Sequence, residues 1–156
     1  MEDVKRLNDA EERAWRALQF MQMRLEAELA RQLAAESGLS YPDYLVLVTL
    51  TDHPDGRLRL FELGATLAWE KSRLSHHVVR MADRGLVKKE PCDDDRRGAF
   101  VAVTKKGRNE IEAAAPCHVR SVRRLFVERL TPDELDVIAI VAEKVLAGMD
   151  DSRREP

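Results

Sequence analysis

Cysteine, glycine and proline are scarce in this sequence of 156 residues, which contains two Cys, seven Gly and six Pro. Two cysteines, Cys92 and Cys117, are too few for a disulfide framework, and they do not form a Cys-x-x-Cys pair. The low Gly and Pro content, with 44% hydrophobic and 35% charged residues, excludes fibrous and disordered classes. The composition indicates a helix-rich globular protein.

Long apolar runs are also absent. The longest wholly apolar run, residues 137–142, is far too short to span a membrane. The first residues are charged and lack the apolar core of a secretion signal. We therefore expect a single cytoplasmic domain over 1–156, a length that suffices for one sizeable core.

Positive charge is concentrated in one segment of a chain whose net charge is −2. Residues 71–89 contain six Lys or Arg and a single acid, Asp83, so this segment carries +5 and the rest of the chain −7. A local basic patch on an otherwise acidic protein is typical of a site for a polyanion such as nucleic acid.

Long amphipathic helices are predicted at both ends of the chain. Apolar residues at steps of three, four or seven predict a helix over 4–35, which Gly38 closes. Near the other end, a helix containing Pro116, which should kink or break it, precedes a last helix that begins at a capping box on Thr131. One small domain offers too little core to cover both apolar stripes, so we expect the end helices to form a homodimer. The alternative is that they pack on each other within a monomer.

The middle of the chain, residues 40–107, predicts a lobe of short elements. In order, these are a helix from a Ser40 cap to Thr51, a short strand at 58–60, helices at 61–68 and 71–84, and strands at 86–90 and 99–104 around a polar loop at 91–98. A short helix, a tight turn, a basic helix that ends at glycine and a charged hairpin are the layout of a winged helix-turn-helix. The expected fold class is therefore mainly α with a small β-hairpin.

The basic helix over 71–84 is the expected DNA-reading element. Leu74, Val78 and Met81 share the face that must pack into the lobe. The candidate DNA contacts on the other side are Lys71, Ser72, Arg73, Ser75, His76, Val79 and Arg80. Val79, an apolar residue directed outward, could lie against a thymine methyl. Taken without its context, the helix would be an ordinary amphipathic helix with a solvated basic face.

The predicted hairpin tip carries three acids followed by two arginines. An arginine at a hairpin tip can enter a narrow minor groove, where the potential is most negative. The candidate wing contacts are Asp95, Arg96 and Arg97, with Asp95 placed to hold Arg97 by an ion pair. The alternative for the acids is a solubilising turn.

Four short motifs occur in a specific order and spacing: Lys71-Ser72-Arg73-Leu74-Ser75, Arg84-Gly85-Leu86-Val87, Asp95-Arg96-Arg97-Gly98 and Val103-Thr104-Lys105-Lys106-Gly107. Together they resemble the MarR family of bacterial transcription regulators. The resemblance implies a homodimer joined by helices 4–37 and 108–149, whose two lobes place recognition helices in successive major grooves of a pseudo-palindromic site. It also implies that Arg97 of the wing, 86–104, contacts the minor groove. Members of the family usually act as repressors, so a repressor is expected here.

The resemblance further implies release of DNA by a small anionic or phenolic effector, or by an oxidant. Trp15, Phe20, Met21 and His118 could line an effector pocket, although helical aromatics and methionines are more often plain core. Cys92 and Cys117 could sense oxidants only if neighbouring cations acidified their thiols. The simpler interpretation is one buried small hydrophobe and one incidental surface thiol.

Other functional classes have weaker support. We find no phosphate-binding loop, nucleophile elbow or metal-ligand spacing, so the sequence predicts no enzyme, no cofactor and no metal site. A winged-helix module that docks an acidic protein partner, without sequence-specific DNA binding, remains the alternative to a regulator that binds double-stranded DNA.

Overall fold

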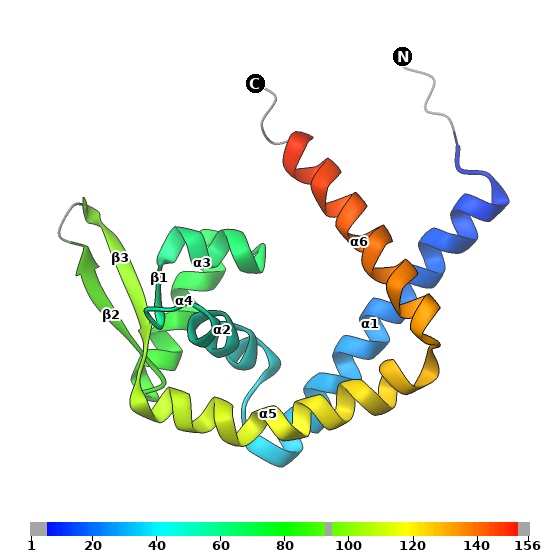
Figure 1. Ribbon diagram of the computed structural model, residues 1–156. Helices are drawn as coiled ribbons and strands as arrows, with labels where there is room; N and C mark the ends of the chain where they lie inside the picture. Colours follow the sequence, from blue (N-terminus) through cyan, green and yellow to red (C-terminus); the bar gives the residue numbers. More distant parts are fainter. Residues whose placement is uncertain (1–5, 93–94, 153–156) are drawn as a thin grey trace. The chain divides into compact units, whose positions relative to one another are not determined.

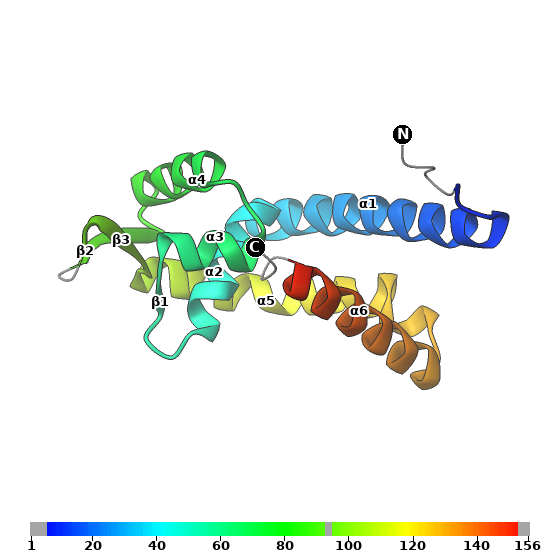
Figure 2. The ribbon, with the colours of Figure 1, turned by 90° about the horizontal axis from the view of Figure 1, so that it is seen from above.

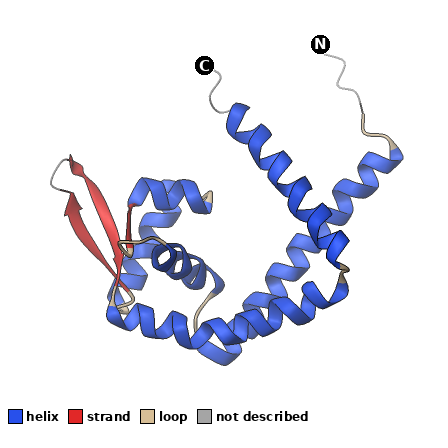
Figure 3. Cartoon of the chain, in the orientation of Figure 1, coloured by secondary structure: helices blue, strands red, loops and turns tan. Residues whose placement is uncertain are grey.

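Helices dominate the computed structural model, which describes residues 6–92 and 95–152 (Figure 3). The elements in chain order are α1 (Asp9–Ser37), α2 (Tyr41–Asp52), β1 (Arg57–Arg59), α3 (Leu60–Leu67), α4 (Lys71–Asp83), β2 (Val87–Cys92), β3 (Asp95–Val103), α5 (Lys105–Leu125), the 3₁₀ helix η1 (Val127–Arg129) and α6 (Pro132–Ser152). The predicted fold class, mainly α with a small hairpin, is confirmed. Within the described ranges, no helix has both the length and the apolar character needed to cross a membrane.

The chain divides into two units, Met1–His118 and Val119–Pro156. The first unit holds α1 to α4, the sheet and the first part of α5, and the second holds the end of α5, η1 and α6. All the candidate nucleic-acid contacts belong to the first unit.

The core of the first unit lies where α2, α3 and α4 pack against the sheet. Its fully buried side chains come from each of these elements, including Leu47, Leu63, Leu74, Met81 and Val101. On α4 these are the positions that the helical spacing assigned to the inner face, and Leu74, Val78 and Met81 are at most 1% exposed. The packing therefore fixes which side of α4 faces outward (Figure 2).

The strands form an antiparallel sheet in the order β1-β3-β2, with β2 and β3 as a long hairpin (Figure 1). Their pairing runs from Val87 opposite Val103 to Cys92 opposite Asp95, with an irregularity between Pro91 and Cys92. The predicted polar loop at 91–98 is therefore wrong, because most of it continues the two strands. Backbone hydrogen bonds between paired strands do not require apolar side chains, so a segment of polar composition can still form strand.

Two expected boundaries also differ. The first helix begins at Asp9 rather than residue 4, because Asn8 forms a capping box with Glu11. The other end of α1 is as expected, with Gly38 in a left-handed conformation at φ 73°. The possible break at Pro116 is wrong, since α5 continues through this residue to Leu125. One missing N–H does not interrupt a helix that is hydrogen bonded on both sides.

The junction between the sheet and α5 depends on Thr104 and Gly107. The Thr104 hydroxyl donates to the Gly85 carbonyl oxygen at 2.6 Å and accepts from the Gly107 N–H at 3.0 Å, which caps α5 as the sequence predicts. Gly107 lies against Leu86, the residue before β2, because a Cβ on Gly107 would overlap the Leu86 carbonyl oxygen and come within 3.0 Å of Val103 Cγ2 in β3. A side chain there would force the backbone of α5 away from the hairpin.

We expect Gly107→Ala to lower the free energy of unfolding by about 2 kcal/mol, because the added methyl overlaps backbone atoms that cannot rotate away. Urea unfolding followed by far-UV circular dichroism measures the change. Gly148→Ala in α6 is the matched control, since a Cβ there meets no atom within 4 Å. It should leave stability unchanged or raise it by up to about 1 kcal/mol. Equal effects of the two substitutions would contradict the close approach.

Candidate nucleic-acid interface

The outward side of α4 carries the cationic and polar side chains that the sequence singled out. Lys71, Ser72, Arg73, His76, Val79 and Arg80 are exposed and Ser75 is half-buried. Val79 is 44% exposed, so this apolar side chain is directed away from the core, as the helical spacing predicts. The structure thus brings the seven candidate contacts of this helix onto one accessible surface.

A half-buried tryptophan shapes the turn between α3 and α4. Ala68 ends α3 in a left-handed conformation, with φ 52°, and Trp69 follows it. The guanidinium of Arg73 lies over the Trp69 ring, 4.4 Å from its centroid. This cation–π contact holds Arg73 near the start of α4.

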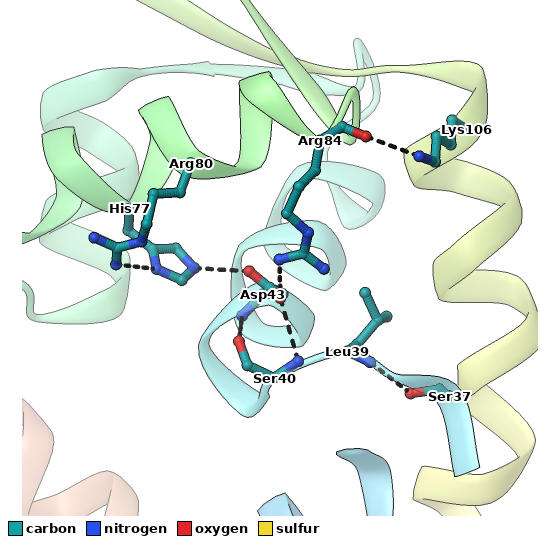
Figure 4. Close-up of polar contacts among 8 residues, drawn as sticks. All are labelled: Ser37, Leu39, Ser40, Asp43, His77, Arg80, Arg84 and Lys106. Atoms are coloured by element: carbon teal, nitrogen blue, oxygen red, sulfur yellow. Dashed lines mark hydrogen bonds and ion pairs between the residues drawn. The ribbon is translucent and has the colours of Figure 1, made fainter. Parts of the chain in front are cut away.

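A buried carboxylate on α2 fastens α4 to the rest of the lobe (Figure 4). Asp43 is 2% exposed, and its Oδ2 accepts from Arg84 Nη1 at 2.7 Å. Its Oδ1 lies 3.1 Å from Nε2 of His77, in a bent geometry that falls short of a regular hydrogen bond. Ser40 completes the set, because its N–H donates to Asp43 while its hydroxyl accepts from the Asp43 N–H. One carboxylate therefore joins the cap of α2 to two positions of α4.

These contacts also set the protonation state of Asp43. Burial alone would raise the pKa of a carboxyl group, but the contacts with His77, Arg84 and Ser40 outweigh burial and hold the pKa of Asp43 well below its ordinary value of 3.8. Asp43 is therefore ionised at neutral pH, and its negative charge faces the guanidinium of Arg84.

The end of α4 is tied to α5 as well as to α2. Lys106 Nζ donates to the Arg84 carbonyl oxygen at 2.8 Å. Gly85 follows in a left-handed conformation, and the Leu86 N–H donates to the Met81 carbonyl oxygen. This glycine terminates the helix as the sequence predicts and turns the chain into β2.

The wing is braced by charged side chains at its base. Glu90 of β2 contacts Arg57 of β1 at 3.2 Å and Lys88 at 2.7 Å, and these contacts lower the pKa of Glu90. The guanidinium groups of Arg57 and Arg59 lie over the Phe100 ring of β3. The backbone of the candidate wing contacts, Asp95, Arg96 and Arg97, lies in β3, whereas their side chains, and that of Cys92, lie outside the described part of the chain.

The candidate effector residues do not lie in one environment. Trp15, Phe20 and Met21 of α1 are exposed, by 52%, 60% and 42%. His118 of α5 is half-buried, and its ring lies 4.4 Å from that of Tyr44. Burial lowers the pKa of His118.

Tyr41 and Tyr44 complete this aromatic group, and sequence reasoning did not single them out. The two tyrosine rings are stacked with centroids 6.4 Å apart, and Tyr41 lies 6.0 Å from His118. Cys117, the neighbour of His118, is buried at 5% exposure.

The fastening of α4 was also not predicted. Only one signal in the sequence pointed to it: His77 falls between Leu74 and Met81 on the inner side of the helix, at steps of three and four. A histidine on a buried face requires polar partners. The spacing alone could not identify Asp43, 34 residues earlier in the chain, as that partner.

The short helix α3, the turn at Trp69, the exposed basic helix α4 and the β2–β3 hairpin define a winged helix-turn-helix protein. A family model described as the MarR family matches residues 37–98. Transcriptional regulator HosA of Escherichia coli is 30% identical over 109 residues, which are 69% of this chain and 78% of HosA. The chain belongs to the MarR family of DNA-binding transcription regulators, as its motifs predicted, and this is a family of regulators rather than enzymes.

Solved structures agree with this assignment. AbsC, a MarR family transcriptional regulator from Streptomyces coelicolor, matches with a TM-score of 0.87 and 33% identity over 95% of this chain and 99% of AbsC. Sco3205, a MarR family regulator from the same organism whose structure is a complex with DNA, matches with a TM-score of 0.87 and 35% identity over 92% of this chain and 91% of Sco3205.

We expect Asp43→Asn to lower the free energy of unfolding by about 2 kcal/mol at pH 7, because the charge-assisted contacts of the carboxylate are lost. Because the pKa of Asp43 is lower in the folded than in the unfolded protein, its ionised carboxylate stabilises the fold above pH 3.8. This stabilisation is lost as the pH falls below 3.8. The wild type should therefore lose more stability than the variant between pH 7 and pH about 2. Urea unfolding at both pH values measures this difference. The control is Asp55→Asn, an exposed carboxylate whose removal should change stability by less than about 0.5 kcal/mol; an equal pH dependence of wild type and Asp43→Asn would refute the role of Asp43.

Proposed function

We propose that the protein binds a pseudo-palindromic operator as a homodimer, represses the genes beside that operator, and releases the DNA when a small aromatic effector binds. The outward side of α4 carries this proposal. It combines cationic side chains with Ser72, His76 and Val79, and so offers hydrogen-bond donors, acceptors and one apolar contact to base edges. A surface that served phosphate alone would need only the cations.

The assignment of individual contacts follows from reach. Arg73 and Arg80 on α4 are exposed and long enough to bond guanine in a major groove, while Lys71 at the start of the helix suits a phosphate. Arg97 lies in β3 near the turn of the hairpin, and we assign it to the adjacent minor groove. The complex of Sco3205 with DNA supports a DNA-binding role for a chain of this fold and identity.

We expect Arg73→Ala and Arg97→Ala each to weaken binding to a specific duplex by about 1–2 kcal/mol, or roughly five- to thirtyfold. The duplex is one that the wild-type protein selects from a randomised library, and fluorescence anisotropy at two salt concentrations measures the affinity. Arg13→Ala in α1 removes the same charge away from α4 and the wing, and should leave affinity unchanged. Selection that enriches no sequence would instead favour the protein-docking module.

The dimer part of the proposal rests on exposed apolar side chains at both ends of the chain. On α1 these are Trp15, Leu18, Phe20, Met21 and Met23, and on α6 they are Val137, Ile140, Val141, Val145, Leu146 and Met149. Each is at least 42% exposed, and exposed apolar side chains concentrated along one helix mark an interaction surface. Self-association through a twofold axis covers such surfaces on both copies at once.

Val141→Glu should shift the protein from dimer to monomer, because burying an unpaired carboxylate in the interface costs several kcal/mol. Sedimentation velocity at micromolar concentration measures the mass. Glu143→Lys alters a charge on the polar side of α6 and should leave the dimer intact. A monomeric wild type, or a fully dimeric Val141→Glu, would rule out α6 as an interface helix.

The effector part rests on the aromatic group of Tyr41, Tyr44 and His118. Tyr44 is buried, but Tyr41 and His118 are half-buried, so the group reaches the surface and can accept a further aromatic ring. A His118 kept neutral by burial can offer a hydrogen bond to that ring. The DNA titration repeated with a simple phenolic acid measures release directly.

A further inference from the structure

His77 is the buried polar side chain of α4, a helix that the structure describes in full and whose other polar side chains are exposed or, for Ser75, half-buried. It is 8% exposed. Asp43 lies at Nε2 of its imidazole and Arg80 at Nδ1 (Figure 4). The ring of Trp69 meets the imidazole as a third neighbour. Its surroundings therefore connect the buried carboxylate to the surface of the helix.

These partners permit a single arrangement of the ring proton. A carboxylate only accepts, so the Nε2 that faces Asp43 at 3.1 Å carries the proton. A guanidinium only donates, so the Nδ1 that lies 3.2 Å from Arg80 Nη2 presents its lone pair. With its Nε2 proton toward Asp43 and its Nδ1 lone pair toward Arg80, the ring faces one acceptor and one donor, so that Asp43 sets the tautomer and Nδ1 holds the arginine.

The His77 ring also supports Arg73 indirectly, through the ring of Trp69. Trp69 meets His77 edge to face, with centroids 5.4 Å apart and planes at 89°. The Trp69 ring is also in contact with the Arg73 guanidinium, which lies 4.4 Å from its centroid. Both arginines that we assign to base edges are thus held by side chains in contact with His77.

We propose that His77 is a positioning residue for DNA recognition. Its ring, oriented by Asp43, holds Arg80 by direct contact and Arg73 through the ring of Trp69. The inference rests on the proposed DNA contacts of these two arginines. A free arginine side chain loses its rotamer freedom when it binds, whereas one already held by a neighbour loses less. The network therefore favours affinity for the operator without touching the DNA.

Two conservative variants separate this role from plain packing. An Asn side chain carries its polar atoms near the position of Nδ1, so His77→Asn keeps an acceptor for Arg80 and loses the reach to Asp43. A Gln side chain places its amide near Nε2, so His77→Gln keeps a donor for Asp43 and loses the acceptor for Arg80. If His77 served only the packing of the lobe, His77→Gln, which keeps the contact with Asp43, would be the better variant both in stability and in DNA binding.

We expect His77→Gln to bind the library-selected duplex about fivefold more weakly than the wild type, a loss that matches the ordering of one or two side chains. We expect His77→Asn to recover most of that affinity, although it should be the less stable of the two in urea unfolding. Anisotropy titrations on protein shown to be folded by circular dichroism make the comparison. Wild-type affinity in both variants, or an equal loss in both, would overturn the inference.

Arg80→Ala and Arg73→Ala in the same titration distinguish the two levels of the argument. If these variants bind more weakly while both His77 variants bind as the wild type does, the DNA contacts stand and the positioning role is overturned. If the arginine variants bind as the wild type does, the proposed contacts themselves fail, and the positioning role fails with them.

Discussion

The arrangement of the DNA-binding lobe depends on the burial of one negative charge between two helices. Asp43 lies at the start of α2, yet its carboxylate contacts His77 of α4 and Arg84, the residue that caps the end of α4. The helix α4 therefore cannot rotate or slide without separating a buried charge from its partners. Removing a carboxylate from water is costly unless cationic and hydrogen-bonding groups surround it. Arg84, Ser40 and His77 surround Asp43 in this way. The contacts that offset the cost of burying the carboxylate also fix the orientation of α4.

Apolar packing and polar contacts divide the work of orienting α4. Leu74, Val78 and Met81 bury one face of the helix and decide which side is outward. Apolar contacts are not directional, so they leave the helix some freedom to shift along its axis. The polar contacts of Asp43, and the one between Lys106 and the Arg84 carbonyl oxygen, remove that freedom because hydrogen bonds require particular distances and angles.

Local signals in the sequence identified most of the fold. Capping residues, glycines and apolar spacing predicted α1 to α6 and the hairpin, because helix ends and turns depend on side chains within a few residues of one another. One error occurred where local composition and long-range pairing disagree. The charged segment 91–98 has the composition of a loop, but it is held as strand by pairing with its partner across the hairpin.

Local motifs and helical periodicity were enough to predict the class of protein, the recognition helix and the outward position of Arg73, Val79 and Arg80, since periodicity assigns each residue of a helix to a face. The contacts that hold those side chains could be found only in the folded chain. Asp43 and His77 are 34 residues apart and Trp69 lies in a turn, so nothing in their local spacing connects them. Their contacts arise from the packing of α2 against α4, and a contact between distant segments is fixed by the whole core rather than by either segment alone.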